Sequence, residues 1–451
     1  MSTALVILAA GKGTRMNSDI PKVLHPIAHA SMLAHAMRTG AALEPERTII
    51  VAGHEAGLVA KAAHEVDETA EIVLQTEQKG TAHAVDQARD ALADFDGDVV
   101  VLFADTPFLR PETLEKMIAA RADYDLVILG FEAADPARYG RLVMNNGSLD
   151  RIVEYKDATQ AERALTLCNS GLVACDCKLL FDLIAQVGDD NASGEYYLTD
   201  IVEMARAAGH SATAVTCDET ETLGINSRAD LAKADAVFQT RARTELLDNG
   251  VTLMDPETVY LAFDTYIGRD ALIEPNVVFG PGVTVESGAT IRAFSHLEGC
   301  HVSRGAIVGP YARLRPGTEL SEDVRVGNFV EIKNAVIAEG AKINHLSYIG
   351  DATIGAKSNI GAGTITCNYD GVMKHQTTIG AGVFVGSNTM LIAPVTLGDD
   401  SMTASGSVIT KNVEDGALAI SRAPIEIRPG WAKKLFTLLR KKKSKQDKGQ
   451  N

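Results

Sequence analysis

Two glycines and two cations near the start of the chain could together hold a phosphate group. Residues 9–16, Ala-Ala-Gly-Lys-Gly-Thr-Arg-Met, follow directly on an apolar run. Gly11 and Gly13 leave backbone N–H groups free to surround a phosphate, and Arg15 and Lys22 can supply positive charge. The segment fits neither the Walker A loop nor the dinucleotide fingerprint, which needs a third glycine. A tight turn from a strand into a helix explains the two glycines equally well.

Two further side chains stand where they could do chemistry. Asp105 follows the apolar run 98–104, and open α/β sheets bind their ligands beyond the carboxyl ends of strands. Its carboxylate suits Mg²⁺, although it could also cap a helix that begins near Pro111. A histidine such as His345 can remove a proton near neutral pH. Taken alone, His345 fits a solvated surface position better.

The glycines and cations near the start of the chain, and Asp105, lie in a region where expected strands alternate with expected helices. We expect strands at residues 5–10, 48–52, 71–75, 98–104 and 125–130, and helices at 31–40, 55–66, 81–93 and 112–121. Continuous β-branched strands separated by helices predict a mostly parallel, Rossmann-like α/β sheet that is covered on both faces. After residue 140, Asn146-Gly147 between two alternating runs predicts a β-hairpin.

A different period begins at residue 267. Apolar residues recur every six positions through residue 297 and, after one step of five, from 302 to 332. Further stretches continue to residue 397, and glycine follows many of the apolar positions. Three six-residue strands make one triangular coil, in which one aliphatic side chain per side fills the interior. The pattern predicts a left-handed parallel β-helix of hexapeptide repeats.

Two segments fall outside these periods. Residues 361–378 interrupt the repeat with a polar loop, which has no packing purpose of its own and is a candidate binding feature. Residues 227–249 have the pattern of one long helix, with Ser227 as its N-cap and Gly250 after its end. We therefore expect an N-terminal domain at 1–226, a linker helix at 227–250, a β-helix domain at 251–430 and a basic tail at 431–451.

The charge of the chain limits the classes of partner that it can bind, and its cysteine content indicates the redox environment in which it works. The 451 residues carry 43 Lys and Arg against 59 Asp and Glu, a net charge of −16. Residues 431–451 hold eight of the cations and one Asp, so the preceding 430 residues are strongly acidic. An acidic body disfavours nucleic-acid binding. Six cysteines are too few for a disulfide scaffold and indicate reduced thiols in a cytoplasmic protein.

The N-terminal segment resembles the signature of sugar-nucleotide pyrophosphorylases, on the residues Leu8, Gly11, Gly13, Thr14, Arg15, Met16, Pro21 and Lys22. With the hexapeptide repeats, residues 4–431 resemble the bacterial bifunctional N-acetylglucosamine-1-phosphate uridylyltransferase/glucosamine-1-phosphate acetyltransferases. The resemblance implies that the chain acetylates glucosamine 1-phosphate with acetyl-CoA. It then transfers UMP from UTP to the product, giving UDP-N-acetylglucosamine and pyrophosphate for cell-wall and lipopolysaccharide precursors. Mg²⁺ as a cofactor and a homotrimer are also implied.

The resemblance assigns roles in the nucleotidyltransferase (pyrophosphorylase) domain residue by residue. Lys22 and Arg15 become catalytic, and Asp105 and Asn226 become metal ligands. The implied nucleotide contacts are Leu8, Gly11, Gly13, Lys22, Gln75, Gly80 and Thr81. The implied sugar-phosphate contacts are Gly140, Glu154, Asn169 and Asn226.

In the acetyltransferase domain, the resemblance makes His345 the catalytic base, although Asn344 stands where the family has Gly. The implied contacts of the amino-sugar phosphate are Arg315, Lys333, Tyr348 and Asn359. Asn368 and Tyr369 match positions at the amino sugar and are grouped at acetyl-CoA with Ser387, Ser405 and Arg422. Ser405 departs from the family pattern, which has Ala there.

Other interpretations stay open. A monofunctional sugar-1-phosphate nucleotidylyltransferase with a structural β-helix would have no use for His345 or Tyr348. A purely structural solenoid beside a degenerate nucleotide-binding domain would have no use for Lys22 or Asp105. The basic tail is expected to be disordered, and the alternative is a basic amphipathic helix that weakly contacts an anionic membrane surface.

Overall fold

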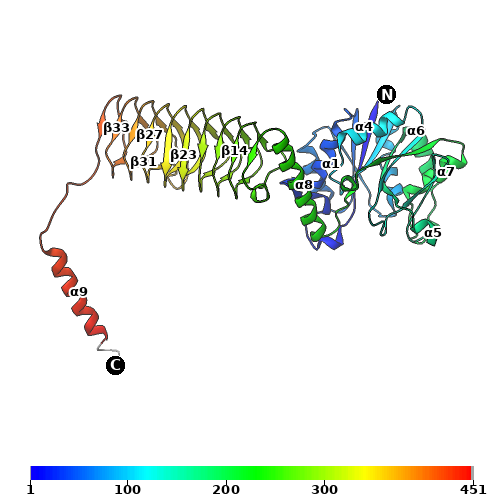
Figure 1. Ribbon diagram of the computed structural model, residues 1–451, viewed down its shortest axis with the longest axis horizontal. Helices are drawn as coiled ribbons and strands as arrows, with labels where there is room; N and C mark the ends of the chain where they lie inside the picture. Colours follow the sequence, from blue (N-terminus) through cyan, green and yellow to red (C-terminus); the bar gives the residue numbers. More distant parts are fainter. Residues whose placement is uncertain (1, 448–451) are drawn as a thin grey trace. The chain divides into compact units, whose positions relative to one another are not determined.

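The computed structural model describes residues 2–447, which form two compact units. One unit contains the chain up to Asp248 together with Tyr260–Thr265, and the other contains Asn249–Val259 and the chain from Tyr266 onward (Figure 1). No helix within the described residues combines the length and the apolar character that crossing a membrane requires. Residues 448–451 of the predicted basic tail lie outside the described part of the chain.

The first unit is built on a nine-stranded sheet. Its main path is β11-β7-β10-β6-β1-β4-β5, and the hairpin β8-β9 joins it through β10. The strands are β1 (Thr3–Ala9), β4 (Arg47–Ala52), β5 (Glu71–Leu74), β6 (Asp98–Phe103), β7 (Leu126–Glu132), β8 (Arg141–Asn145), β9 (Ser148–Val153), β10 (Leu167–Asp176) and β11 (Ala212–Cys217). Neighbours on the path are parallel, except that β10 runs antiparallel to β6 and β7. The predicted mostly parallel sheet is confirmed.

Helices cover both faces of this sheet. The helices of the unit are α1 (Met32–Ala41), α2 (Ala56–His64), α3 (Thr81–Asp86), α4 (Pro111–Ala120), α5 (Gln160–Arg163), α6 (Cys177–Ile184), α7 (Ile201–Ala207) and α8 (Arg228–Asp248). On β1, Val6 and Leu8 belong to one core together with α3, α6 and α7, whereas Leu5 and Ile7 belong to a second core with α1, α2 and α4. Because both faces are buried, β1 is apolar at consecutive positions.

Two local predictions can be followed in atomic detail. Asn146 and Gly147 both have positive φ, 49° and 83°, as the two-residue turn of the hairpin β8-β9 requires. Helix α8 follows Ser227, whose Oγ accepts a hydrogen bond from the backbone N–H of Asp230 at 3.2 Å. Ala234 of α8 is buried in a core cluster of the first unit, so this helix packs as part of that unit.

The second unit is a left-handed parallel β-helix. One stack contains β12 (Thr252–Leu253), β14 (Leu272–Ile273), β17 (Thr290–Ile291), β20 (Ile307–Val308), β23 (Arg325–Asn328), β25 (Lys342–His345), β27 (Asn359–Ile360), β30 (Phe384–Val385), β33 (Met402–Thr403) and β35 (Leu418–Ala419). Its interior is a ladder of aliphatic side chains in register, such as Ile291, Val308, Val326 and Ile343. All four are buried, which confirms the six-residue period as the core of a solenoid.

The remaining strands form the other walls of the β-helix. They are β13 (Tyr266–Ile267), β15 (Val278–Phe279), β16 (Thr284–Val285), β18 (His296–Leu297), β19 (Cys300–Val302), β21 (Arg313–Leu314), β22 (Thr318–Leu320), β24 (Glu331–Ile337), β26 (Tyr348–Ile354), β28 (Ile365–Cys367), β29 (Thr377–Ile379), β31 (Met390–Ile392), β32 (Val395–Leu397) and β34 (Val408–Ile409). The polar interruption seen in the sequence leaves the solenoid between β28 and β29.

The tail differs from the expectation. Where the sequence suggested disorder from residue 431, the structure has helix α9 (Trp431–Asp447). The segment contains no proline and no glycine, and it is rich in Leu, Lys and Arg, which have high helix propensity. Local propensity is therefore sufficient reason for this helix.

Candidate active sites

Lys22 lies between the two residues that we expected to bind a metal. Its side chain is buried, and its Nζ donates hydrogen bonds to a carboxylate oxygen of Asp105 and, at 2.8 Å, to Oδ1 of Asn226. The guanidinium of Arg15 donates to the same oxygen of Asn226 at 2.8 Å. Four predicted residues from separate segments thus meet where a cation is held by two oxygens.

The sheet topology and helix α8 bring these segments together. Strands β1 and β6 are parallel neighbours, so the loop after β1 and Asp105 after β6 leave the same edge of the sheet. The backbone N–H of Ile225 donates to the carbonyl of Asp105 at 3.1 Å. The backbone N–H groups of Asn226 and Ser227 donate to the carboxylate of Asp230 at 3.1 and 2.9 Å. The first turn of α8 therefore fixes the Asn226 segment beside Asp105.

The two glycines of the first loop have different surroundings. Gly13 has a φ of 59°, and a Cβ there would overlap the Cβ of Lys22. Only glycine allows both the backbone turn and the close approach of Lys22. A Cβ at Gly11 would meet no protein atom within 4 Å, so its backbone borders open space. Leu8 is buried on β1, next to Phe103 on β6.

Three of the predicted nucleotide contacts, Gln75, Gly80 and Thr81, lie in or beside one turn. Gln75 is buried, and its Nε2 donates to the carbonyl of Gly80 at 3.2 Å, just before Thr81 begins α3. Gln78 from the same turn donates through Nε2 to the carbonyl of Ala10 at 2.6 Å. This hydrogen bond joins the turn to the loop that contains Gly11 and Gly13. The structure therefore brings the nucleotide-binding residues predicted on three segments to one place.

A pocket of about 110 Å³ contains two of the four predicted sugar-phosphate contacts, Glu154 and Asn169, whereas Asn226 lies in the Lys22 cluster. Its lining includes Thr81, Phe103, Ile152, Glu154, Asn169 and Leu198. Gly140 lies beside it, since a Cβ there would be 3.3 Å from Oε1 of Glu154. Burial raises the pKa of the Glu154 carboxyl, and the carboxylates of Asp157 and Asp200 raise it further. Apolar walls with a carboxyl and an amide side chain suit a ring that carries hydroxyl groups.

His345 stands at one edge of the β-helix, at the end of β25. Asn328 lies beside it on the preceding coil, and its Oδ1 accepts a hydrogen bond from Nδ1 of His345 at 3.0 Å. The register of the stack places Ser387 two coils and Ser405 three coils beyond His345 along the same edge. Arg422 donates to the carbonyl of Ser405 at 2.8 Å. With adjacent strands about 4.8 Å apart, the row from His345 to Ser405 is roughly 14 Å long.

Cations gather on the neighbouring wall. Arg315 and Lys333 occupy equivalent positions on consecutive coils, and the guanidinium of Arg315 donates to the carboxylate of Glu331 at 2.9 Å. A side-chain hydrogen bond with Lys333 lowers the pKa of Lys374, and the like charge of the Lys333 ammonium lowers it further. Three cations facing one region suit a phosphate monoester.

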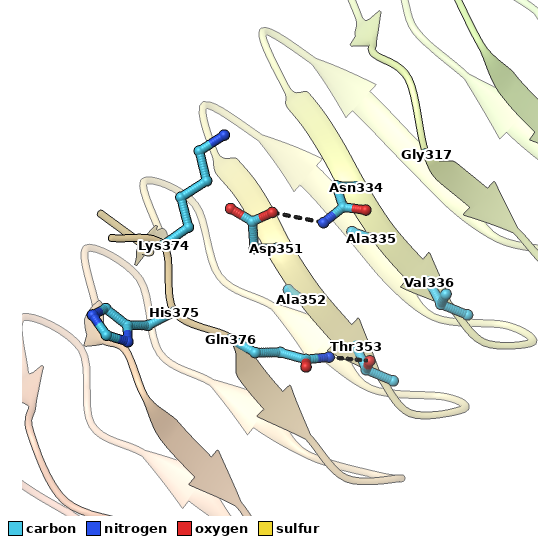
Figure 2. Close-up of a pocket in the computed structure, with 10 residues that line it drawn as sticks. All are labelled: Gly317, Asn334, Ala335, Val336, Asp351, Ala352, Thr353, Lys374, His375 and Gln376. Atoms are coloured by element: carbon cyan, nitrogen blue, oxygen red, sulfur yellow. Dashed lines mark hydrogen bonds between the residues drawn. The ribbon is translucent and has the colours of Figure 1, made fainter. Parts of the chain in front are cut away.

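Asp351 connects this wall to the polar loop. In Figure 2, Asn334 donates to one carboxylate oxygen of Asp351, at 2.7 Å, within a pocket of about 340 Å³ that Lys374 also lines. Asn368 donates to the other oxygen and has its Nδ2 3.5 Å from the Tyr348 hydroxyl. Partial burial opposes ionisation of Asp351, but hydrogen bonds from Asn334 and Asn368 and the nearby lysines lower its pKa overall. The loop residue Asn368 is therefore fixed against the β-helix.

Two predicted residues of this domain lie apart from these contacts. Tyr369 is 60% exposed, and its hydroxyl donates at 2.6 Å to the carbonyl of Gly371 within its own loop. Asn359 begins β27 and pairs with Lys342 on the preceding coil. Lys342 is three residues before His345, so Asn359 lies outside the row formed by His345, Ser387 and Ser405.

Comparisons with known proteins cover the whole chain. The MobA-like NTP transferase domain matches residues 5–170, the bacterial transferase hexapeptide (six repeats) matches residues 264–299, and the GMPPB C-terminal domain matches residues 296–395. The Bifunctional protein GlmU of Ruegeria sp. (strain TM1040) is 72% identical over 449 residues, with 100% of both chains covered. The chain belongs to the GlmU family of bifunctional proteins.

Two other GlmU proteins give matches of the same extent. That of Ruegeria pomeroyi is 74% identical over 448 residues, which are 99% of this chain and 100% of the relative. That of Roseobacter denitrificans is 69% identical over 449 residues, with 100% of both chains covered. Membership of the GlmU family therefore extends to both units of the structure.

Sequence reasoning missed three polar residues that the structure places in this GlmU chain beside the predicted ones. Asn328 and Glu331 each lie 17 positions before a predicted residue, because one coil separates the paired positions. The length of a coil was therefore the signal that would have found them. Lys374 lies in the polar loop that the sequence had already singled out, but nothing in its local sequence indicates that it returns to Lys333.

Proposed function

We propose that the chain carries two enzymatic activities, each in its own domain. The β-helix domain, residues 251–430, acetylates glucosamine 1-phosphate with acetyl-CoA. The N-terminal domain, residues 1–226, transfers UMP from UTP to N-acetylglucosamine 1-phosphate and releases pyrophosphate. The observation that carries this proposal is the presence of two separate polar clusters in one chain, which matches a GlmU protein over the whole of that protein's length. One joins Lys22 to Asp105 and Asn226, and the other joins Asn328 to His345.

In the first site, the residues position two anions and offset their charge. An oxygen of the sugar phosphate attacks the α-phosphorus of UTP, and pyrophosphate leaves. Such a reaction needs alignment and charge neutralisation more than covalent help. Lys22 and Arg15 would donate to phosphate oxygens, while the backbone at Gly11 and Gly13 leaves room for the nucleotide. Glu154 and Asn169 of the sugar pocket would hold the acceptor by its hydroxyl and amide groups.

Asp105 and Asn226 are suited to hold Mg²⁺. They present a carboxylate oxygen and an amide oxygen to one ammonium group, that of Lys22, so their oxygens already converge on a positive charge. Mg²⁺ prefers oxygen ligands and usually binds through one or two protein side chains together with substrate phosphates. When bound there, the ion would supply neutralisation of the phosphate charge. Lys22 provides the ammonium donor of the same site.

In the second site, His345 would act as the base. Because its Nδ1 donates to Asn328, the lone pair of the ring lies on Nε2. Nε2 can remove a proton from the amine of glucosamine 1-phosphate as the nitrogen attacks the thioester carbonyl. A C–N bond then forms, the C–S bond breaks, and coenzyme A leaves as a thiolate, which can take up the proton held on Nε2.

The surroundings of His345 would hold the two substrates. Arg315, Lys333 and Lys374 supply the positive charge for the sugar phosphate. Tyr348 and Asn368, together with Asn359 and Tyr369, would contact the amino sugar. Acetyl-CoA would lie along the row formed by Ser387, Ser405 and Arg422. Each coil along this row is one strand spacing farther from His345.

We also propose that the protein assembles as a homotrimer through an apolar column next to His345. Phe294, Tyr311, Phe329 and Leu346 occupy consecutive corners of the β-helix, and each is between 47% and 62% exposed. The ring of Tyr311 stacks on those of Phe294 and Phe329, with centroids 4.9 and 5.3 Å apart. A contiguous exposed apolar patch of this kind typically marks an interface. Leu346 directly follows His345, so an adjoining copy would stand close to the acetyl-transfer site.

One coupled assay tests the two activities. The folded chain is incubated with glucosamine 1-phosphate, acetyl-CoA, UTP and Mg²⁺, and each component is omitted in turn. We expect UDP-N-acetylglucosamine only when all are present, and N-acetylglucosamine 1-phosphate when UTP is absent. Supplying N-acetylglucosamine 1-phosphate should make acetyl-CoA unnecessary. Uridylyl transfer without acetyl transfer would instead support a monofunctional nucleotidylyltransferase with a structural β-helix.

The assembly is tested by sedimentation velocity on Tyr311→Glu. A carboxylate in the column should convert trimers to monomers and should reduce acetyl transfer while leaving uridylyl transfer unchanged. Tyr266→Glu is the matched control, because Tyr266 is 60% exposed and lies outside the column. A trimer that persists in Tyr311→Glu would exclude this column as the interface.

A further inference from the structure

Helix α9 has an apolar face that no part of the described chain covers. At about 100° per residue, Trp431, Leu435, Leu438 and Leu439 lie within one face of the helix about 100° wide. All four side chains are exposed, by 46% to 64%. Exposing such a face to water is unfavourable, so a surface that buries it would stabilise the protein.

The same helix carries a dense positive charge. Seven cations lie on it within the described residues: Lys433, Lys434, Arg440, Lys441, Lys442, Lys443 and Lys445. All are exposed, and no acidic side chain among residues 2–446 forms an ion pair with any of them. The rest of the chain is acidic, which makes this concentration of charge local to α9. The partner of the apolar face must therefore also be negatively charged.

A short extended segment precedes the helix. Residues 423–430 form neither helix nor strand and contain Pro424 and Pro429. Eight extended residues span about 26 Å, so α9 can reach a surface while Arg422 stays bonded to Ser405. The helix is also too short and too charged to cross a bilayer, in keeping with the finding for the described residues as a whole.

We propose that α9 binds the surface of membranes rich in anionic lipids. The Trp and Leu face lies in the first half of α9, and most of its cations lie in the second half, where they surround the helix. A helix that combines an apolar face with many Lys and Arg lies in the plane of the bilayer interface. Its apolar face enters the boundary between headgroups and acyl chains, and its cations meet the lipid phosphates. A nucleic acid would satisfy the cations but leave the leucines exposed. An anionic bilayer satisfies both, and the inference does not depend on the two proposed activities.

The test uses the full-length protein and lipid vesicles. Trp431 is the only tryptophan of the chain, so its fluorescence reports on α9 directly. With vesicles of equal parts phosphatidylglycerol and phosphatidylcholine, we expect its emission to shift to shorter wavelength and the protein to float with the vesicles. Binding should be about tenfold weaker to phosphatidylcholine alone and should fall as salt is added.

Two sets of substitutions separate the contributions. Leu435→Ser, Leu438→Ser and Leu439→Ser together should abolish flotation, and their control is the exposed set Leu58→Ser, Leu165→Ser and Leu247→Ser. Lys441→Gln, Lys442→Gln and Lys443→Gln should weaken binding about tenfold, with the exposed set Lys61→Gln, Lys116→Gln and Lys178→Gln as control. Both activities in solution should be unchanged in the α9 variants.

Three outcomes would overturn the proposal. Flotation that survives the leucine substitutions would show that α9 is not the membrane contact. Equal binding to neutral and anionic vesicles would show that its charge has no part in binding. A change in sedimentation of the leucine variant without lipid would assign the apolar face to a second copy of the chain instead.

Discussion

Asn328 and His345 stand on neighbouring coils of the β-helix, and the amide oxygen of Asn328 accepts a hydrogen bond from Nδ1 of His345 at 3.0 Å. An amide oxygen can only accept, so this contact selects the tautomer of the imidazole that has its lone pair on Nε2. It also fixes the plane of an exposed ring that would otherwise turn freely. Asn328 is therefore a positioning residue for the proposed base.

Replacing Asn328 tests this role. Asn328→Ala should lower kcat of acetyl transfer about tenfold, which is less than the 10²–10⁴-fold that a general base itself contributes. Asn328→Asp should restore much of the rate but shift the acidic limb of the pH–rate profile to higher pH, because a carboxylate stabilises the protonated imidazole. Uridylyl transfer serves as the internal control. An unchanged pH profile in Asn328→Asp would contradict the proposed contact.

Lys22→Ala should reduce uridylyl transfer by about 10²–10³-fold, the usual effect of removing one electrostatic donor from a transition state. Acetyl transfer should stay near normal, because the Lys22 cluster and the His345 row belong to different units. Lys61→Ala is a matched control on an exposed lysine of α2. Both rates are measured separately on the same preparation. Loss of both activities in a folded variant would argue against two independent sites.

Gly13→Ala should impair both stability and uridylyl transfer. The positive φ of Gly13 costs an alanine about 1–2 kcal/mol, and the added Cβ must displace Lys22. We expect uridylyl transfer to fall at least about tenfold, in keeping with a misplaced catalytic group. Gly57→Ala is the control, since a Cβ there meets nothing within 4 Å and its φ is not positive. Thermal unfolding and initial rates together measure the effect.

Much of the fold was predictable because its determinants are periodic. Apolar residues at every sixth position predict the β-helix, since each one fills a fixed place in a coil. Strand β10 shows what an apolar pattern leaves undetermined. Its run from Leu172 to Cys175 is as apolar as the parallel strands beside it, yet β10 runs antiparallel between β6 and β7. An apolar pattern records burial, whereas strand direction depends on how the chain returns to the sheet.

The candidate sites were less accessible to sequence reasoning than the fold. Lys22 meets Asp105 and Asn226 across 83 and 204 positions, and no local pattern encodes such contacts. The resemblance to a family proposed these residues, and their convergence in space supports the proposal. Contacts of Asn328 and Lys374 follow from coil register and from the path of a loop, which only the structure provides.

Glu154 should make the stability of the N-terminal unit depend on pH. Burial, together with Asp157 and Asp200, raises the pKa of this carboxyl in the folded state. The folded protein therefore holds the proton more tightly than the unfolded chain. This contribution to stability is complete below the ordinary carboxyl pKa and is lost as the pH rises through the raised value.

Glu154→Gln removes the ionisation while keeping the size of the side chain. The variant should match the parent protein at acidic pH and exceed it in stability at neutral pH, as measured by denaturant unfolding of the N-terminal transition across this range. The KM for N-acetylglucosamine 1-phosphate should rise roughly tenfold, because a hydrogen bond to a charged group is worth about 1.5–3 kcal/mol. Asp182→Asn, at an exposed carboxylate of α6, is the control. A parent protein more stable than Glu154→Gln at neutral pH would show that the ionised carboxylate is favourably paired, opposite to the direction inferred here.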